Sequence, residues 1–363
     1  MLDSLDFEAL HRIGLAAPLL QQLASLAPDA DTRLLRVVEV QREHLLLHDG
    51  HAEQRARSGP ALLDALQAED DGLAVGDWVL ARPDGQGGWW IVERLAPLTQ
   101  LARRVNDGRG SPRRQVLVSN VGTAVLVMGL DHDFNLRRLE RYLALVRLAG
   151  VDAVLVLTKA DTVDAATLAR RSAQAREILP PATCLLALDG RAAATAQALS
   201  PWARAGQTLV LLGSSGAGKS TLTNTLTGLA TQSTGDVRAD DSRGRHTTTV
   251  RTLRCTAAGA CVIDTPGLRA LRLDVGGEGE LDAVFGDVAH WAGQCRFRDC
   301  RHQAEPGCAV REAVAPERLR NFHKLQREAR RDTMTALERR EQVAVWKARG
   351  RNAAVRMRAK REG

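Results

Sequence analysis

One glycine-rich octapeptide constrains the fold more than any other segment of this chain. The sequence GSSGAGKS runs from Gly213 to Ser220, after the apolar segment TLVLLG and before the segment TLTNTLTG. Its spacing matches the phosphate-binding loop G-x-x-x-x-G-K-[ST], which needs a strand before it and a helix after it. Backbone N–H groups of such a loop surround phosphate oxygens at the positive end of the helix. The motif predicts that Lys219 contacts the terminal phosphates and that Ser220 holds Mg²⁺.

Apolar strands alternate with amphipathic helices from about residue 116 onward, which is typical of a parallel sheet covered by helices. The expected strands are VLVSNVGTAVLVMG (116–129), DAVLVLT (152–158), TCLLAL (183–188) and TLVLLG (208–213), with helices near 136–150, 163–178 and 191–204. The chain therefore predicts a central α/β domain around the octapeptide.

Two segments downstream of the octapeptide have the chemistry of phosphate sensors. In ACVIDTPG, Asp264 ends an apolar strand and can take a water-mediated place around Mg²⁺, while Gly267 can offer its N–H to the γ-phosphate. The polar stretch GDVRADDSRGRHTTTVRT lies between the octapeptide and this strand and is typical of a switch segment. Thr248 is the expected contact to Mg²⁺ and γ-phosphate, with Thr247 as the second candidate.

The base is indicated by VLTKAD, residues 156–161. A carboxylate at Asp161 can accept from both N1–H and the exocyclic amine of guanine, a donor pair that adenine lacks. The stem of Lys159 can lie flat on the ring, and the N–H of Ala187, one helix later, can reach the guanine carbonyl. The segment therefore favours GTP.

VLTKAD precedes the phosphate-binding loop, whereas an ordinary GTPase has the reverse order. A parallel sheet keeps its loops at the carboxyl ends of its strands wherever the chain begins. A fold cut before its base-binding half and rejoined at its old ends would therefore keep the same site. The chain would then leave the sheet directly after Asp264-Thr-Pro-Gly267, and whatever follows is attached to the γ-phosphate sensor.

The N-terminal part has a different pattern. Leu5, Leu10, Ile13, Leu15, Leu19, Leu20 and Leu23 predict an amphipathic helical segment that Pro28 closes. The short alternating segments RLLRVVEV, HLLLH, GDWVLAR and GWWIVERL then predict a small closed barrel of the OB type. Trp78, Trp89 and Trp90 can stack on bases, but packing in or around the barrel core is the alternative for at least two of them.

A cluster of metal ligands follows the α/β segment, at Cys295, Cys300, His302 and Cys308. Three thiolates and one imidazole suit a closed tetrahedral Zn²⁺ site, which is structural because no coordination position stays open. Cys184, Cys255 and Cys261 lie in apolar strands and are expected to be small core residues.

Charge and hydropathy indicate the partner and the compartment. Fifteen basic and six acidic residues lie between Glu317 and Gly363, so the remainder carries −2 of the total +7. A basic tail favours a polyanionic partner, with RNA as the default, although a solvated helix is the alternative. No apolar run reaches transmembrane length and no signal peptide is evident, so we expect a cytoplasmic protein without a membrane or DNA partner. No heptad interface is evident, and a monomer is expected.

Catalysis is less well determined by the sequence. Leu268 occupies the position where a Ras-like enzyme has the glutamine that orients the attacking water. His246, in GRHTTT, is the best candidate for that role beside Lys219, and a polar switch residue without a catalytic part is the alternative. Slow intrinsic hydrolysis, raised by a partner, is therefore expected.

The order TKAD, GSSGAGKST, GRHTTT and DTPG, between a barrel and a Cys/His cluster, resembles the circularly permuted family called ribosome small subunit-dependent GTPase A. The resemblance implies hydrolysis of GTP during late maturation of the small (30S) ribosomal subunit, with rRNA binding, stimulation by that particle and release after hydrolysis. Two positions depart from the family pattern: Thr158 stands where asparagine is common, so a weaker brace to the phosphate-binding loop is expected, and Leu186-Ala187 replaces Ser-Ala.

The implied organisation is multidomain, with the GTPase motifs in the order G4-G5-G1-G2-G3. Its parts are an N-terminal helical extension (1–30), an OB-fold RNA-binding domain (31–112), the permuted GTPase domain (113–275) and a zinc-binding α-helical domain with a basic tail (276–363). The expected contacts to GTP and Mg²⁺ are Thr158, Lys159, Ala160, Asp161, Ala187, Gly213, Ser214, Ser215, Gly216, Ala217, Gly218, Lys219, Ser220, Thr221, Thr248, Asp264 and Gly267. The alternatives are a P-loop ATPase or kinase, and a passive RNA-binding assembly chaperone whose nucleotide site only stabilises the fold.

Overall fold

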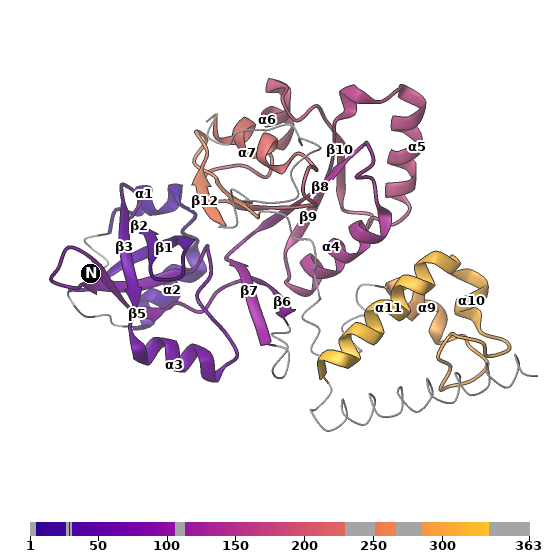
Figure 1. The fold of residues 1–363 in the computed structure, drawn as a ribbon, viewed down its shortest axis with the longest axis horizontal. Helices are drawn as coiled ribbons and strands as arrows, with labels where there is room; N and C mark the ends of the chain where they lie inside the picture. Colours follow the sequence, from indigo (N-terminus) through magenta and orange to yellow (C-terminus); the bar gives the residue numbers. More distant parts are fainter. Residues whose placement is uncertain are drawn as a thin grey trace, which may run out of the picture. The chain divides into compact units, whose positions relative to one another are not determined.

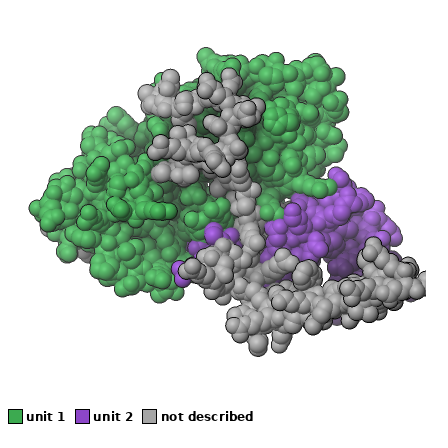
Figure 2. All heavy atoms as spheres, viewed as in Figure 1, with its two compact units in different colours: residues 1–103, 115–271 green, residues 104–114, 272–363 purple. Residues whose placement is uncertain are grey.

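The computed structural model describes residues 5–26, 29, 31–105, 113–228, 251–265 and 285–333 (Figure 1). The chain forms two compact units, one of residues 1–103 and 115–271 and the other of residues 104–114 and 272–363 (Figure 2). The first unit contains both the predicted barrel and the predicted α/β sheet. Among the described residues, no helix is long and apolar enough to cross a membrane.

The N-terminal segment forms two short helices, α1 (Phe7–Arg12) and α2 (Ala17–Leu26). The predicted helical pattern is interrupted at Gly14, whose φ of +90° few other residues adopt. A Cβ at Gly14 would lie 2.1 Å from Nη1 of Arg36, so the glycine also makes room for that buried guanidinium.

Five strands close into a barrel in the order β1-β2-β3-β5-β4-β1, with β3 and β5 parallel and the other pairs antiparallel. This topology confirms the predicted OB-type barrel. The strands are β1 (Arg33–Val40), β2 (Leu45–His48), β3 (Glu53–Ser58), β4 (Trp78–Pro83) and β5 (Trp89–Arg94), and α3 (Pro60–Ala68) follows β3.

The barrel core consists of alternate residues of these strands, namely Leu35, Val37, Leu45, Leu47, Ala56, Val79, Ala81 and Ile91. Trp78 is fully buried, and Trp89 packs half-buried against this core. Trp90 is 36% exposed. The expectation that at least two of the three tryptophans pack in or around the core is therefore confirmed.

The predicted strand 116–129 is wrong in one respect, because the structure divides it into β7 (Arg113–Ser119) and β8 (Thr123–Gly129). Asn120 causes the break, with a φ of +54° that asparagine tolerates better than most residues. Both ends of its side-chain amide form hydrogen bonds: Nδ2 donates to the Gly76 carbonyl at 3.0 Å, and Oδ1 accepts from the Leu98 N–H at 2.9 Å. Strand β7 pairs with β6 (Gln100–Val105) in a separate two-stranded sheet.

The α/β sheet has the strand order β10-β9-β8-β11-β13-β12, in which only β12 is antiparallel to its neighbour. Its strands beyond β8 are β9 (Asp152–Thr158), β10 (Cys184–Ala187), β11 (Thr208–Leu212), β12 (Thr252–Cys255) and β13 (Cys261–Asp264). The helices that connect them are α4 (Leu136–Leu148), α5 (Ala165–Arg176), α6 (Ala193–Leu199) and α7 (Lys219–Thr227).

The described C-terminal part of the second unit, 285–333, is helical, with α9 (Gly286–Ala292), α10 (Ala309–Ala313) and α11 (Pro316–Thr333). Phe285 and Phe322 pack edge to face with ring centroids 5.3 Å apart, and Val288 and Val310 are also buried in this unit. Arg318 adds a two-pronged ion pair to Asp287, at 2.5 and 2.7 Å. The basic end of the predicted tail, 334–363, lies outside the described residues.

Candidate nucleotide site and metal centre

The described residues of the predicted nucleotide site converge on one edge of the α/β sheet. The register pairs Gly129 with Thr158 and Leu211 with Asp264, so strands β8, β9, β11 and β13 end at the same edge. Ala187 ends β10 there as well, opposite Leu157. Segments that lie far apart in sequence are therefore neighbours at the carboxyl ends of the strands, where ligands of open α/β sheets bind.

The phosphate-binding loop is packed tightly between β8 and the start of α7. A Cβ at Gly213 would lie 2.5 Å from the Val127 carbonyl oxygen, and Gly218 has a φ of +98°, so both positions require glycine. Lys219 is the first residue of α7, and its Nζ donates to the carbonyls of Gly213 at 2.9 Å and Ser214 at 2.6 Å. The loop thus holds an ammonium group where it can meet a phosphate.

Two charged groups at this edge are buried together. Lys219 is 6% exposed and Asp264, at the end of β13, is 5% exposed. Burial lowers the pKa of Lys219, while the carboxylates of Asp264 and Asp133 act in the opposite direction. Thr265 locks the end of β13, because its hydroxyl donates to the Leu211 carbonyl at 2.5 Å. A carboxylate and a half-buried Ser220 hydroxyl are oxygen ligands of the kind that Mg²⁺ prefers.

Thr158 links the TKAD segment, the predicted base-binding segment, to the loop GSSGAGKS. Its hydroxyl donates to the Ala217 carbonyl at 2.6 Å, and the side chain is 2% exposed. A Cβ at Gly218 would lie 3.3 Å from the same hydroxyl oxygen, so the loop lies directly against it. The threonine therefore makes a direct brace at the position where the family pattern has asparagine.

Removal of this hydroxyl should weaken nucleotide binding. In Thr158→Val protein the Ala217 carbonyl loses a buried donor, which costs about 1 kcal/mol and should raise the Kd for GDP roughly fivefold. Titration with a fluorescent GDP analogue measures the change. Thr158→Ser keeps the hydroxyl and is the matched control. Equal affinity of the valine and serine variants would contradict a bracing role.

The TKAD segment itself forms a tight turn. Lys159 adopts the left-handed region with a φ of +60°, and its Nζ donates to Oδ2 of Asp131 at 2.7 Å. Asp161 follows in a 3₁₀ turn (Ala160–Thr162) with an exposed carboxylate. The Ala160 N–H donates to the Leu188 carbonyl at 3.3 Å, which joins the turn to the end of β10.

The structure adds Asp131 and Asp133, which the sequence interpretation missed. Partial burial opposes the charged form of Asp131, but bonds from Lys159 and the Asp133 N–H hold its pKa below the usual range. Asp133 is 7% exposed and accepts from the Gly129 N–H at 3.0 Å, from Arg138 at 2.5 Å and from the Ser214 hydroxyl. It therefore ties the phosphate-binding loop to the start of α4. The signal was GLDHDFN, which places two aspartates just after a buried strand.

Three predicted site residues cannot be placed at this edge. Thr248 and His246 belong to the segment 229–250, and Gly267 belongs to 266–284, so all three lie outside the described residues. Their roles in phosphate sensing and in orienting water stay predictions.

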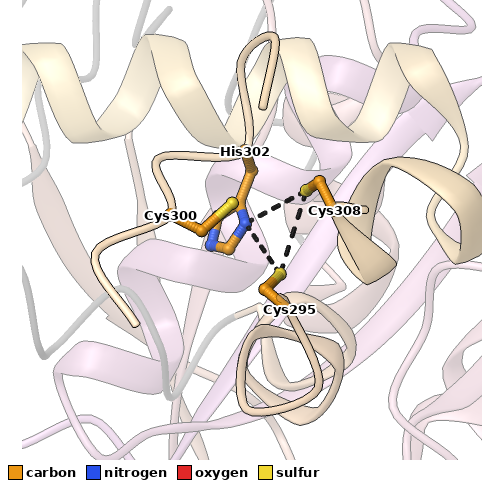
Figure 3. A group of neighbouring side chains, drawn as sticks. All are labelled: Cys295, Cys300, His302 and Cys308. Carbon is orange, nitrogen blue, oxygen red and sulfur yellow. Dashed lines mark hydrogen bonds between the residues drawn. The ribbon is translucent and has the colours of Figure 1, made fainter. Parts of the chain in front are cut away.

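The predicted metal ligands meet in the second unit. The donor atoms of Cys295, Cys300, His302 and Cys308 all lie within 4.8 Å of one another (Figure 3). His302 Nδ1 is 3.5 Å from the sulfurs of Cys295 and of Cys308, and those two sulfurs are 3.9 Å apart. Two thiolates bound at ~2.3 Å in a tetrahedron lie about 3.8 Å apart, so the spacing fits Zn²⁺.

The surrounding helices hold these ligands in place. Cys295 follows α9, Cys308 caps the start of α10, and His323 on α11 bonds through Nε2 to the His302 carbonyl at 3.1 Å. His302 itself has a φ of +58°, which turns the loop sharply at the ligand. Neither His290 nor His323 belongs to the ligand group found among the described residues.

Comparison with known proteins places this combination of features in one group. Residues 96–274 match the family model described as RsgA GTPase. The Small ribosomal subunit biogenesis GTPase RsgA of Xylella fastidiosa (strain 9a5c) is 43% identical over 317 residues, which cover 84% of this chain and 88% of that relative. The protein of the same name from Mesorhizobium japonicum is also 43% identical, over 315 residues covering 85% of this chain and 86% of that relative.

Two solved structures share the fold. The crystal structure of YjeQ from Thermotoga maritima has a TM-score of 0.57 and 23% identity, covering 82% of this chain and 98% of that one. YloQ, described as a circularly permuted GTPase, has a TM-score of 0.55 and 23% identity, covering 83% of this chain and 96% of that one. The chain therefore shares the fold of a protein described as a circularly permuted GTPase, in agreement with the permutation inferred from the order of the motifs.

Proposed function

Because this chain belongs to the RsgA GTPase family and is a GTP-hydrolysing enzyme, we propose that its substrate site is the sheet edge formed by β8, β9, β10, β11 and β13. We further propose that hydrolysis serves late maturation of the small ribosomal subunit, whose rRNA the protein binds and leaves after hydrolysis.

The observation that carries the site assignment is the brace between the two halves of the site. Thr158, at the start of TKAD, bonds to Ala217 of the phosphate-binding loop although 59 positions separate them. This contact supports a single ligand that spans both segments, with its base at TKAD and its phosphates at GSSGAGKS. A nucleotide that spans both segments binds as in a Ras-like enzyme, except that the two segments occur in the opposite order along the chain.

Each residue then has a defined task toward GTP and Mg²⁺. The carboxylate of Asp161 accepts from the guanine edge, the stem of Lys159 covers the ring, and the Ala187 N–H faces the guanine carbonyl. The remaining contacts come from the backbone of Gly213 to Gly218, from Lys219 to the terminal phosphates, and from Ser220, Thr221 and Asp264 around the metal. Bound Mg²⁺ supplies neutralisation of phosphate charge. Thr248, Gly267 and His246 complete this proposal for the γ-phosphate and the water.

The barrel supports the rRNA part of the proposal. The exposed Trp90 of β5 lies directly opposite Arg57 of β3 and Arg82 of β4, and both arginines are exposed. An aromatic ring between two guanidinium groups suits a base and its flanking phosphates. The relatives are named for the small ribosomal subunit, and a particle that presents rRNA agrees with this surface.

The same proposal assigns one structural Zn²⁺ to Cys295, Cys300, His302 and Cys308. It also describes a cytoplasmic monomer that binds no DNA. The described cysteines form no disulfide, which fits a reducing compartment.

Stimulation by ribosomal particles tests the proposal directly. GTP hydrolysis should rise at least tenfold with purified small subunits and remain unchanged with large subunits, because only the proposed partner orders the switch segments. Phosphate release under multiple-turnover conditions measures both. Lys219→Ala protein should stay inactive with either particle. A small-subunit effect no larger than the large-subunit effect would overturn the assignment of the partner.

A further inference from the structure

Two cysteines that belong to neither site face each other at the edge of the α/β sheet. Strands β12 and β13 are antiparallel, and their register pairs Cys255 with Cys261. The expectation that both are small core residues is wrong for Cys255, which is exposed at the end of its strand, whereas Cys261 is fully buried.

The hydrogen bonds of the hairpin show what kind of pair this is. Thr256 and Ala260 form the next pair toward the turn, and the Thr256 N–H donates to the Ala260 carbonyl at 2.8 Å. The Cys261 N–H points away from β12 and donates to the Gln207 carbonyl at 2.8 Å. Because bonded and non-bonded pairs alternate along an antiparallel ladder, Cys255 and Cys261 form a non-hydrogen-bonded pair, with Cα atoms ~4.5 Å apart. That separation lies within the range that a disulfide spans, roughly 4.4–6.8 Å.

A buried cation stands beside this pair. Arg36 is fully buried, and its guanidinium donates to Thr208 Oγ1 at 3.0 Å, to the Asn120 carbonyl at 3.2 Å and to the Ile13 carbonyl. Its charge acts on both thiols. The Cys261 thiol, followed by Arg36, lowers the pKa of Cys255 to about 7, against the effect of partial burial. The Cys255 thiol is therefore the more nucleophilic of the two.

We propose that Cys255 and Cys261 form a reversible intramolecular disulfide when the protein meets a hydroperoxide, with Cys255 attacking and Cys261 resolving. In the first step the Cys255 thiolate attacks a peroxide oxygen of H₂O₂, the O–O bond breaks, and the sulfur becomes a sulfenic acid while hydroxide leaves and takes up a proton as water. In the second step Cys261 attacks that sulfur, the S–O bond breaks, and hydroxide leaves with the thiol proton as water. Two thiols and one peroxide thus give one disulfide and two waters, and an external dithiol reverses the reaction.

The position of the pair determines what the disulfide would change. Strand β12 follows the segment 229–250, and β13 ends at Asp264, so the hairpin connects two parts of the proposed phosphate-sensing machinery. Strand β12 also pairs with the barrel, where Thr252 lies opposite Glu39 of β1. A covalent link between Cys255 and Cys261 fixes the register of β12 on β13 at the end of β13 remote from Asp264.

Trypsin offers a direct measurement on the full, zinc-loaded chain. Cleavage after Arg254 and Arg269 releases one peptide, CTAAGACVIDTPGLR, that contains both cysteines. After treatment with hydrogen peroxide and then N-ethylmaleimide, we expect this peptide to be unlabelled and lighter by two hydrogen atoms than the dithiol form. Dithiothreitol should restore double labelling. Cys184, which lies opposite Val154 rather than a cysteine, should remain labelled throughout and is the internal control.

Two variants separate the roles of the sulfurs. In Cys261→Ser protein the sulfenic acid on Cys255 should persist and be captured by dimedone, whereas in Cys255→Ser protein Cys261 should stay reduced. Double labelling of the wild-type peptide after peroxide, under conditions that oxidise a free model thiol, would overturn the proposal. So would oxidation of Cys261 in the Cys255→Ser protein at the wild-type rate. The wild-type peptide decides the question even where a variant fails to fold.

Discussion

Asp161→Asn protein should prefer xanthosine triphosphate to GTP, a reversal of base preference. In the proposed site the carboxylate of Asp161 accepts two N–H groups from guanine, whereas an asparagine there would accept only one and would point its amide donor at the other. Loss of this double contact to a charged acceptor costs about 3 kcal/mol, so the Kd for GTP should rise on the order of a hundredfold. Xanthine carries a carbonyl in place of the exocyclic amine, and the asparagine amide can donate to it.

The substitution should change base recognition without changing the stability of the protein. Asp161 is exposed in its 3₁₀ turn, so the isosteric change should leave the unfolding temperature unchanged. Competition titrations with GTP, xanthosine triphosphate and ATP against a fluorescent nucleotide measure the preference. Asp164→Asn is the matched control, because Asp164 is exposed, caps α5 through the Thr167 N–H at 2.7 Å and loses the same charge. If GTP affinity were equally unaffected in both variants, or if ATP competed with the wild type as well as GTP, the base would be recognised elsewhere.

The strands and loops at the proposed nucleotide site could be predicted because each depends on its own short stretch of sequence. Strand β9 has the bounds expected for DAVLVLT. A short run of β-branched and leucine residues is typical of a strand that is buried on both faces of a parallel sheet. The loop at 213–218 needs glycine at defined positions for steric reasons, which makes it visible without any structure. The permuted order followed from the same facts, because TKAD and GSSGAGKS each specify a strand end.

Other elements could not be predicted because their stability comes from distant contacts. Strand β3 has the sequence EQRARS, and only Ala56 is buried. The sequence therefore shows no alternation of apolar and polar residues, and the segment is a strand because it pairs with β2 and β5. Asn120 ends β7 through bonds to Gly76 and Leu98, which lie 44 and 22 positions away. Asp133 joins the site through Ser214, 81 positions along the chain. Long-range hydrogen bonds of this kind leave no periodic signal in the sequence.

The predicted metal centre illustrates both cases. Its four candidate ligands were evident from their spacing, while their effect on stability depends on the helices around them. The described part of the second unit has a small core around three helices, in which Phe285, Val288, Val310, Phe322 and Leu325 are among the buried side chains. Cys295 and Cys308 join the end of α9 to the start of α10 through the ligand cluster. A core of this size needs an additional cross-link to stay folded.

Removal of Zn²⁺ should therefore unfold the second unit and leave the first intact. Structural zinc contributes roughly 10 kcal/mol of apparent folding free energy in small domains, far more than this core can replace. In Cys308→Ser protein, amide hydrogen exchange should lose its protection in α10 and α11 and keep it in β8 and β9, with the zinc content falling from one equivalent to near zero. Cys184→Ala is the matched control, because this cysteine lies on β10 outside the ligand cluster, and the variant should retain both metal and protection.

Full protection of α10 and α11 in metal-free protein would show that the helices hold the four side chains together without the ion. Because the described nucleotide-site residues, from Thr158 to Asp264, belong to the first unit and the metal ligands belong to the second, nucleotide affinity should survive the loss of metal, whereas stimulation by small subunits should not.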